Sequence, residues 1–403
     1  MSKRILYITT VFPSVTHTFI YREIEALTRA GYEIDTASMG QPPKNTISNE
    51  AKRFYESTVY LDQISLAKKL FAQLCILICK PREFFRLLFL ALREKEVENI
   101  KDRIRILYHF IEAGVLFARL KGKKLDHIHA HFLAGPTSIT LFLSRYLGIS
   151  FSFTMHASLI FIDPIMLKTK LLFCKRAVTI SEYNKKYLVA KYGKEFSGKI
   201  DVIHCGIDLQ AFEPKNEQKP FPPVILAVGQ LVERKGFRYL LKACQILKQR
   251  GIIFSCNIVG DGEEMDLLRE KIEEYGIDKL VNLLGREPQE RVRKLLQEAS
   301  IFTLPSIVTD FGGREGIPVA LMEAMAMKLP VVSTRTVGIP ELIENGKEGI
   351  LVEERNAEEL SSALEFLLKN PQTRNQMGIR GRNKVSKDFN LDHIPRAFKP
   401  IFK

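Results

Sequence analysis

Two glutamates lie close to the predicted start of an apolar helix in the second half of the chain. The segment from Arg314 to Met327 reads REGIPVALMEAMAM, with Glu315 in a loop and Glu323 inside the helix. The neighbours of Glu323 are apolar, which favours a buried position over that of an exposed helix carboxylate. A buried carboxylate needs hydrogen-bond partners, and the hydroxyl groups of a sugar are suitable ones.

The residues between the two glutamates predict an anion-binding helix start. Gly316 allows close approach to the backbone, and Pro318 suits the first turn of a helix. The backbone N–H groups of Gly316, Ile317 and Val319 are then directed toward an anion such as a phosphate.

Two adjacent cations, Arg234 and Lys235, precede another predicted helix in the segment GQLVERKGF. Positive charge at a helix N-terminus is unfavourable with the helix dipole, so this pair calls for an anion nearby. Arginine binds phosphate through its planar fork and lysine as a point charge, so a diphosphate is a suitable ligand. A solvated helix start is the alternative.

The elements of the second half bring these side chains to one edge of a sheet. Gly229, Gly260, Gly285 and Ser306 each directly follow a predicted strand. Ligands bind beyond the carboxyl ends of the strands in an open α/β sheet, and glycines let a ligand approach the backbone. Helices are expected at 237–250 and 318–327, and strands at 224–228, 254–259, 281–284, 301–304, 331–333 and 349–352.

The first half has a strand–helix alternation of its own, which favours a second parallel sheet. It lacks G-x-G-x-x-G in its first turn, so a dinucleotide fingerprint is not predicted. At 403 residues the chain exceeds the roughly 250–300 at which a single core stops growing, so two domains are expected. Its opening helix is predicted at 16–30, and its strands at 4–10, 32–39, 126–132, 151–155, 177–180 and 200–204.

The composition is that of a basic globular protein. A formal net charge of +14 attracts polyanions: nucleic acid, an anionic membrane or phosphorylated substrates. Tryptophan is absent and no aromatic-and-basic stripe is present, so we expect no nucleic acid partner. The six cysteines include no C-x-x-C pair, and the N-terminal apolar run is too short for a signal peptide. A reduced, cytoplasmic location is therefore expected.

Residues 63–95 are helical in pattern, apolar and basic. Seven Lys and Arg residues stand against only Glu83 and Glu94, a local net charge of +5. The longest uncharged run, Leu70 to Cys79, has ten residues, against about 20 in a membrane-spanning helix. Pro81 divides the segment into two helices. Packed helices with a solvated basic face and an in-plane anchor on an anionic membrane are both open.

Four histidines lie in or after strands of the first half. His127, His129 and His131 alternate in a predicted strand, which places all three on one side. This pattern imitates a zinc site, but no Cys or carboxylate ligand is tied to it in the sequence, so no metal is expected. His156 ends the strand in FTMHA, where a structural hydrogen bond is the alternative to a chemical role.

Taken together, these motifs resemble a known family. The pattern G-x-L-x-x-[RK]-K-G-F, V-G-D-G, a strand ending in Pro-Ser, and E-G-x-P-x-x-x-x-E-A-x-A is similar to the retaining GT-B glycosyltransferases of family 4 (glycosyl transferases group 1) and spans the second half. In the first half, TTVFPSVTHTFIYREIEAL, HAHFLAGPT and FTMHA resemble the branch that assembles exopolysaccharides such as colanic acid.

The resemblance implies an α/β fold of GT-B type, with two Rossmann-like α/β/α domains facing across a cleft and a C-terminal helix crossing back to the first. We expect an acceptor-binding domain at 1–205, a linker at 206–223, a donor domain at 224–387 and a segment at 388–403 that packs on the first domain. The linker is supported by EPKNEQKPFPP at 213–223, which has no apolar period.

The resemblance also implies roles for individual residues. Arg234 and Lys235 would hold the donor diphosphate, Glu315 the hydroxyls of the transferred sugar, and Glu323 the ribose. His156 would face the donor sugar, so the catalytic set is His156, Glu315, Arg234 and Lys235. Gly285 and Arg286 would border the base. The acceptor side is assigned to Thr16 and His131, and the other donor-binding residues are Gly229, Gly260, Ser306, Gly316, Ile317, Pro318 and Val319.

The implied reaction moves a hexose-type sugar, with retention, from a nucleotide-diphosphate donor to a glycan or lipid-linked acceptor in surface polysaccharide synthesis. The donor is a substrate, so no cofactor is expected. The chain contains no D-x-D, so leaving-group charge would be stabilised without a metal by Arg234, Lys235 and the helix start. The protein would work in the cytoplasm, with a peripheral position on the inner face of the plasma membrane as one option. No catalytic base is assigned.

The sequence departs from the family pattern in two places. Pro13-Ser14-Val15-Thr16 replaces the usual Gly-Gly of the first loop, and four extra residues separate Ser306 from Glu315. Asp310, within that longer loop, is given no role. Two other functions stay open: a nucleotide-sugar epimerase on the same fold, and a non-catalytic, basic membrane-binding protein.

Overall fold

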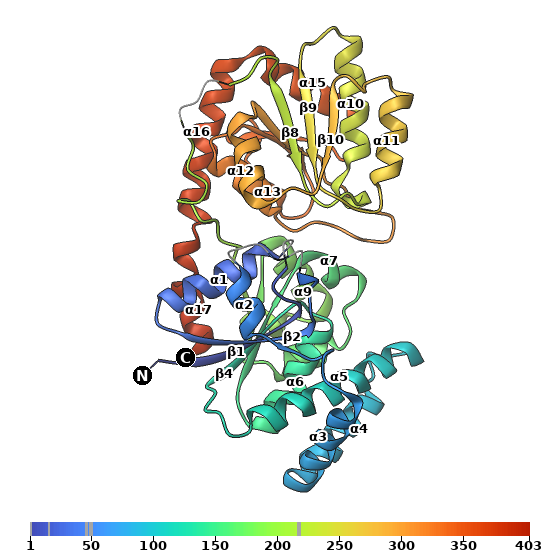
Figure 1. Cartoon of the computed structure of the whole chain (residues 1–403), viewed down its shortest axis with the longest axis vertical. Coiled ribbons are helices and arrows are strands. Elements are labelled where there is room, and N and C mark those ends of the chain that lie inside the picture. Colours follow the sequence, from blue (N-terminus) through green and yellow to red (C-terminus); the bar gives the residue numbers. More distant parts are fainter. Residues whose placement is uncertain (1, 15–16, 45–46, 48–50, 216–218) are drawn as a thin grey trace. The chain divides into compact units, whose positions relative to one another are not determined.

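The computed structural model describes residues 2–14, 17–44, 47, 51–215 and 219–403. The chain forms two compact units (Figure 1). The first unit comprises Met1–His204 together with Asp392–Lys403, and the second comprises Cys205–Leu391. Each unit is built on its own parallel sheet, so the predicted α/β class with two parallel sheets is confirmed.

The first sheet has the strand order β3-β2-β1-β4-β5-β6-β7, with every neighbouring pair parallel. The order reverses between β1 and β4, which is where ligands bind in open α/β sheets. The strands are β1 (Arg4–Val11), β2 (Glu33–Gly40), β3 (Val59–Tyr60), β4 (His127–His131), β5 (Phe151–Met155), β6 (Arg176–Thr179) and β7 (Ile200–Val202).

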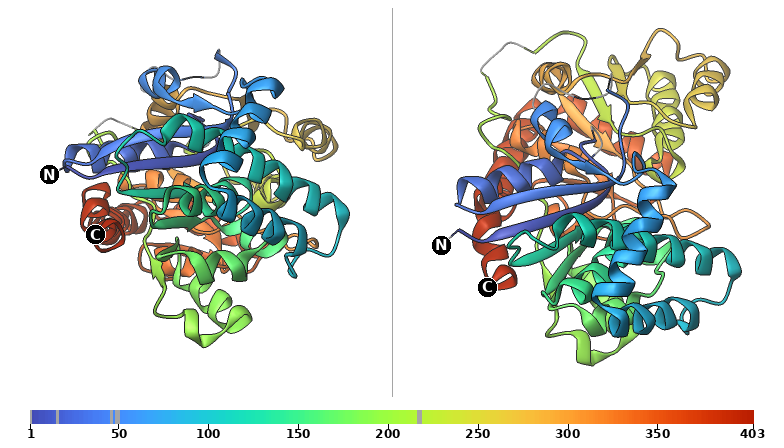
Figure 2. Two further views of the ribbon diagram at one scale, coloured as in Figure 1. Left: turned by 90° about the horizontal axis from the view of Figure 1, so that it is seen from below. Right: turned by 60° about the horizontal axis from the view of Figure 1, so that its bottom comes forward.

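Helices cover the first sheet and add an outer layer at one edge (Figure 2). Pro81 begins the second helix of the basic segment, as predicted, because proline lacks the N–H that a helix interior needs. Asn99 caps the long helix that follows by accepting from the N–H of Asp102. The helices are α1 (Thr18–Arg29), α2 (Lys52–Ser57), α3 (Leu66–Cys79), α4 (Pro81–Arg93), α5 (Ile100–Leu120), α6 (Gly135–Leu147), α7 (Ala157–Ile162), α8 (Leu167–Phe173) and α9 (Glu182–Tyr192), with the 3-10 turn η3 (Lys194–Phe196).

The second sheet has the order β10-β9-β8-β11-β12-β13 and is also parallel. It reverses between β8 and β11, so the loops that follow these two strands meet at its switch point. The strands are β8 (Val224–Val228), β9 (Ser255–Val259), β10 (Val281–Gly285), β11 (Ile301–Leu304), β12 (Val331–Thr334) and β13 (Gly349–Val352).

The helices of the second unit lie on both faces of its sheet, with α10 and α11 on one side and α12 and α13 on the other (Figure 1). They are η4 (Glu233–Lys235), α10 (Phe237–Gln249), α11 (Met265–Glu274), α12 (Gln289–Glu298), α13 (Val319–Ala326), α14 (Ile339–Leu342), α15 (Ala357–Lys369) and α16 (Pro371–Asp388).

The C-terminal end of the chain returns to the first unit. After the 3-10 turn η5 (Leu391–His393), α17 (Ile394–Phe402) buries Phe398 and Phe402 against the imidazole rings of β4. The ring centroid of Phe402 lies 5.5 Å from that of His127, and Phe398 lies 5.3 Å from His129. Lys3 Nζ donates to the carbonyl of Phe402 at 2.7 Å. These contacts explain why α17 belongs to the first compact unit, although it is nearly 400 positions away from the start of that unit in the sequence.

Candidate functional site

The strand ends of the second sheet are joined by backbone hydrogen bonds at three glycines. Gly229 N donates to Val259 O at 3.0 Å, and Gly260 N donates to Gly285 O at 2.8 Å. A Cβ atom on Gly260 would lie 1.8 Å from Gly229 O, so only glycine fits there. Gly285 is the last residue of β10 rather than the first of the loop. The three predicted glycines therefore form one closely packed edge.

The turn that carries the two cations is fixed against the end of β11. Arg234 and Lys235 lie in the 3-10 turn η4, and Gly236 follows with φ of +70°. A Cβ on Gly236 would lie 1.9 Å from the carbonyl oxygen of Pro305. Ile307 N donates to Arg234 O at 2.9 Å. The loop after β8 and the loop after β11 thus position each other.

Glu315 binds both cations, one through each carboxylate oxygen. Arg234 Nε donates to Oε1 at 2.7 Å, and Lys235 Nζ donates to Oε2 at 2.9 Å. The side chains of Lys235 and Glu315 are 12% and 14% exposed, whereas that of Arg234 is 32% exposed. We refer to Arg234, Lys235 and Glu315 as the charged trio.

Two opposing effects act on the pKa of Glu315. Burial raises the pKa of this carboxyl. The charges and hydrogen bonds of Lys235 and Arg234 together lower it by more, so the pKa lies below its ordinary value. Glu315 is therefore ionised at neutral pH, and the trio carries one net positive charge. The anion that the cation pair required is supplied within the protein itself.

Helix α13 begins beside Glu315, in the loop Gly316-Ile317-Pro318. Pro318 is the N-cap residue, so the helix starts at Val319, one residue later than predicted. The N–H groups of Leu321 and Met322 return to the carbonyl of Pro318, at 3.1 and 3.5 Å. Among the described residues, no protein acceptor contacts the N–H of Val319. An unpaired N–H at a helix start is suited to an anion.

Glu323 is buried within α13, with 6% of the residue exposed, so the exposed alternative is wrong. Gln289, the first residue of α12, donates through Nε2 to Oε1 of Glu323 at 3.3 Å. The sequence did not identify Gln289. A glutamine opposite a buried carboxylate is visible only once α12 and α13 are placed on the same face of the sheet.

Ser306 and Arg286 lie on the same edge in different surroundings. Ser306 is buried, and its carbonyl accepts from the Thr334 hydroxyl. Its own Oγ has no hydrogen-bond partner among the described residues. A buried hydroxyl is rarely left without a partner, so Ser306 Oγ is a candidate for ligand contact. Arg286 is exposed directly after β10.

Candidate residues of the first unit form a hydrogen-bonded chain at the end of β4. His131 Nε2 lies 3.1 Å from Glu23 Oε1, and His131 Nδ1 lies 3.0 Å from His156 Nε2. Tyr7 donates its hydroxyl to the same Glu23 oxygen at 2.8 Å. Burial, with the nearby His131 and His17, lowers the pKa of His156 well below its ordinary value. His156 is therefore a neutral imidazole.

The other two histidines of β4 are accounted for by packing. His127, His129 and His131 are all buried on one side of the strand, as predicted. His129 meets Ser152 Oγ at 2.7 Å and Thr154 Oγ1 at 3.0 Å, so both its ring nitrogens have partners from β5. Burial is the largest cause that lowers the pKa of His127, to about 3. These rings stay uncharged beneath α17.

Glu23 supplies the carboxylate that the sequence did not connect with the histidines. One ligand atom each of Glu23, His129 and His131 lies within 4.8 Å of the others, a spacing at which a metal ion could be held. Hydroxyl, imidazole and carboxylate partners already account for the nitrogens of both histidines. The signal for Glu23 was its position on the apolar face of α1, three residues after Ile20 and four before Leu27. Thr16, predicted for the acceptor side, lies outside the described residues.

Two family models match adjoining parts of the chain. Residues 16–211 match the model described as Glycosyltransferase Family 4, and residues 210–384 match Glycosyl transferases group 1. The chain is 41% identical over 207 residues to WcaL of Salmonella typhimurium, named as a colanic acid biosynthesis glycosyltransferase, and 41% identical over 197 residues to AmsK of Erwinia amylovora, named as an amylovoran biosynthesis glycosyltransferase. The match to WcaL covers 51% of this chain and 51% of WcaL, and the match to AmsK covers 49% of this chain and 48% of AmsK. The chain therefore spans about half the length of these relatives.

Solved structures share the fold over nearly the whole chain. Sucrose-phosphate synthase of Thermosynechococcus elongatus superposes with a TM-score of 0.76 at 17% identity, covering 99% of this chain and 98% of that one. Anabaena HepE, solved with UDP and glucose, gives 0.69 at 16% identity, covering 98% and 97%. These likenesses identify the fold as GT-B. The two family models between them match residues 16–384, so the chain belongs to the family 4, group 1 glycosyltransferases.

Proposed function

We propose that the protein transfers a sugar from a nucleoside-diphosphate donor, and that the charged trio holds the donor. The observation that carries this proposal is the pairing of Glu315 with Arg234 and Lys235 at the switch point of the second sheet. Support comes from HepE, whose solved structures contain UDP, UDP with glucose, and UDP-glucose.

The trio has hydrogen-bonding capacity left for a diphosphate. Arg234 offers five N–H donors and Lys235 three, and Glu315 uses one of each. We assign three further contacts to the diphosphate: the remaining donors of the two cations, the N–H of Val319 and the unpartnered Ser306 Oγ. As the bond from the anomeric carbon to the diphosphate breaks, negative charge grows on the leaving phosphate. The fixed cations then bind the transition state more strongly than the ground state.

Glu315 and Glu323 are assigned complementary contacts in this proposal. Glu315 is ionised and held by two cations, so its oxygens are fixed acceptors for hydroxyls of the transferred sugar. Glu323 is buried against Gln289, and we assign it to the ribose, with Gly285 and Arg286 beside the base. We propose retention of configuration, a hexose-type sugar and no metal, as the family resemblance implies. His156, a neutral imidazole, completes the candidate catalytic set.

We place the reaction in surface polysaccharide synthesis in the cytoplasm, with a glycan or lipid-linked acceptor. Support comes from the names of WcaL and AmsK, which describe colanic acid and amylovoran biosynthesis. The basic, apolar helices α3 and α4 support a peripheral position on the inner face of the plasma membrane. Within the described part of the chain, no helix combines the length and hydropathy needed to cross a bilayer.

A panel of nucleotide sugars tests the proposal. A donor should raise the melting temperature, since a ligand of the native state stabilises it. The same donor should release nucleoside diphosphate in the presence of acceptor, and Lys235→Ala should lose both effects. Conversion of the donor to another nucleotide sugar without release would instead show an epimerase. Full donor binding by Lys235→Ala would show that the charged trio is not part of the donor site.

A further inference from the structure

Helices α3 and α4 expose an unusual number of large apolar side chains. Eleven of the exposed large hydrophobic residues described in the structure fall within residues 66–108, on α3, α4 and the start of α5. Exposed fractions reach 74% at Ile100 and 71% at Leu66 and Ile78. On α3 they recur at helical spacing, and so do Phe85, Phe89 and Leu92 on α4. Soluble monomers rarely expose large contiguous apolar patches.

The opposite face of this hairpin is held firmly on α5. Gln73 Nε2 donates to the carbonyl of Ile111 at 2.9 Å, and a Cβ on Gly114 would lie 2.3 Å from that same nitrogen. Lys69 is buried and donates to the hydroxyl of Tyr108 at 3.0 Å. The exposed stripe is therefore a fixed outer face of the first unit, not an unfolded segment.

The exposed charges on α3 and α4 and at the end of the basic segment are almost all positive. Lys69 and Glu94 of the basic segment point inward, and Glu94 accepts from the Thr169 hydroxyl at 2.9 Å. Glu83 is the remaining acid of the segment, only partly exposed. The exposed cations are Lys68, Lys80, Arg82, Arg86, Arg93 and Lys95. Apolar side chains ringed by cations complement an anionic lipid surface.

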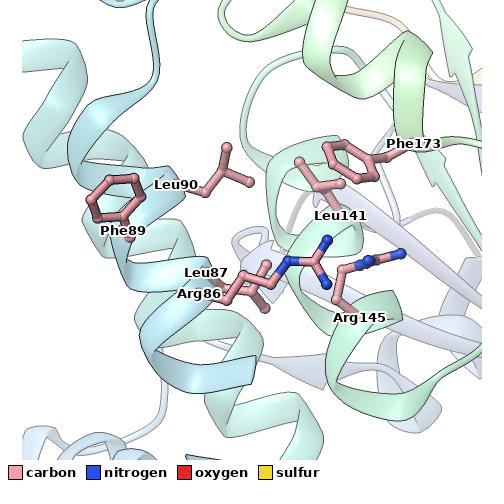
Figure 3. A pocket seen from close by; sticks show the side chains of 7 residues that line it. All are labelled: Arg86, Leu87, Phe89, Leu90, Leu141, Arg145 and Phe173. Atoms are coloured by element: carbon pink, nitrogen blue, oxygen red, sulfur yellow. The ribbon is translucent and has the colours of Figure 1, made fainter. Parts of the chain in front are cut away.

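A cavity opens on this face between α4, α6 and α8 (Figure 3). It holds about 200 Å³ and is lined by Leu87, Phe89, Leu90, Leu141 and Phe173, with two arginines among them, Arg86 and Arg145. Water occupies about 30 Å³ per molecule in the liquid, so the cavity has room for a phosphate with its first carbon atoms.

Both arginines line the cavity, and Figure 3 shows Arg86 extending from α4 in the direction of α6, which carries Arg145. Arg86 meets Glu83 at 3.4 Å, a long and half-exposed contact. The guanidinium of Arg145 lies 5.2 Å from the ring centroid of Phe173. Two guanidinium groups that line one cavity give it positive charge, which favours an anionic ligand. Guanidinium groups bind phosphate through paired hydrogen bonds.

We infer that the cavity between α4, α6 and α8 binds the phosphate of a membrane lipid, with the outer face of α3 and α4 seated in the bilayer interface. Arg86 and Arg145 contact the phosphate, while Phe89, Leu90 and Phe173 contact the first carbons of the lipid chains. This inference extends the proposed membrane position but does not require the proposed sugar transfer, because no donor residue takes part.

Two binding measurements on the full-length protein test the inference. Titration with dihexanoyl phosphatidic acid, a soluble lipid, is compared with inorganic phosphate and with dihexanoylglycerol, which lacks the phosphate. Flotation then compares vesicles of phosphatidylcholine alone with vesicles that also contain phosphatidylglycerol. The variants are R86Q with R145Q, and F85S with F89S. The controls are K123Q with K124Q, exposed lysines of the same unit, and I253S, an exposed apolar residue of the second unit.

The soluble phosphatidic acid should bind more tightly than either fragment. R86Q/R145Q should weaken it about tenfold or more through the lost charge-assisted hydrogen bonds, and K123Q/K124Q should not. F85S/F89S should reduce flotation with anionic vesicles, and I253S should not. Equal binding of inorganic phosphate would overturn the lipid assignment, and unchanged binding by R86Q/R145Q would overturn the site. Melting curves and donor hydrolysis, expected to be unchanged in R86Q/R145Q, exclude misfolding as the cause.

Discussion

Lys235 and Glu315 are 80 positions apart in the sequence, yet Nζ of the lysine donates to Oε2 of the glutamate at 2.9 Å. Both side chains are largely buried, so their orientation is fixed before any ligand binds. The pairing also settles how two adjacent cations are tolerated at a helix start, because the carboxylate from the loop before α13 offsets part of their charge. A donor therefore meets a preorganised set of polar groups.

Lys235→Ala should remove one of the two partners of the buried Glu315. The pKa of Glu315 lies below its ordinary value of 4.5, so the pair stabilises the fold above about pH 4.5, and this contribution is lost as the pH falls through the folded pKa. In Lys235→Ala the pKa of Glu315 in the folded state should rise. The loss of stability on acidification should therefore begin at a higher pH. Acid unfolding curves measure this shift. Coincident curves for variant and wild type would show that the pair is not linked to folding.

Gly236→Ala and Gly251→Ala form a matched pair in the second unit. Their φ angles are +70° and +69°, so alanine carries the same left-handed penalty of about 1–2 kcal/mol at both positions. At Gly251 nothing lies within 4 Å of the added Cβ, whereas at Gly236 the carbonyl oxygen of Pro305 would be 1.9 Å away. Gly236→Ala should therefore lose about 1–3 kcal/mol more, as an overpacked site does.

Urea unfolding of the two glycine variants compares these losses directly. Donor affinity should also fall only in Gly236→Ala, because the loop that carries Arg234 and Lys235 is displaced from Pro305. Equal losses of stability would contradict the close approach of the two loops.

The chain from Tyr7 to His156 fixes the tautomers of two histidines. A carboxylate oxygen accepts only, so Glu23 Oε1 receives the Tyr7 hydroxyl and the N–H at Nε2 of His131. In a neutral His131 ring Nδ1 is then an acceptor, and His156 donates from Nε2. His156 is left with an acceptor lone pair at Nδ1. Nitrogen-15 spectra at pH 7 should show Nε2–H tautomers for both.

His204 is the matched control for the tautomers, since its Nδ1 faces the carbonyl of Ile180 at 2.9 Å and must carry the proton. In Glu23→Gln the uniform tautomer of His131 should be lost while the signal of His204 is unchanged. An Nδ1–H signal from wild-type His156 would contradict the proposed chain.

Glu112 should make the first unit less stable as the pH rises toward neutral. Burial raises the pKa of this carboxyl to about 7, against the opposing effects of Lys69 and Tyr108. Because the pKa is raised in the folded state, the contribution of Glu112 to stability is fully present below about pH 4.5. It is lost as the pH rises through 7, and the total loss in the free energy of unfolding is up to about 3 kcal/mol. Thermal melting of Glu112→Gln should depend less on pH from 5 to 8 than that of the wild type. Glu98→Gln, at an exposed position, serves as the control. An equal dependence of melting temperature on pH in all three proteins would contradict the prediction.

Much of the fold could be predicted from the sequence because each strand carries its own signal. The predicted strands at 4–10, 151–155 and 301–304 correspond closely to β1, β5 and β11, all short, apolar runs buried on both faces. The order of the strands could not be read in the same way, because it depends on which hydrophobic faces pack together over long sequence separations.

The site was predictable only where one segment holds several of its residues. The loop and helix from Glu315 to Glu323 form such a segment, and their predicted place at a strand edge is what the structure shows. Gln289 comes from another helix and was missed. Lys69 was counted in the net charge of the basic segment, but it is buried and donates to the hydroxyl of Tyr108, 39 residues away on α5. Contacts of this kind follow from tertiary packing alone.

The central claim is that Glu315, Arg234 and Lys235 bind and activate a nucleotide-sugar donor. The most direct test measures release of nucleoside diphosphate from the donor that stabilises the wild type, comparing Glu315→Gln and Lys235→Ala with Glu344→Gln, an exposed glutamate paired with Lys347 in the same unit. The claim predicts losses of about 100-fold or more in kcat/KM for the first two variants, as for other groups that stabilise transition-state charge, and wild-type rates for the third. Wild-type release by both Glu315→Gln and Lys235→Ala would contradict it.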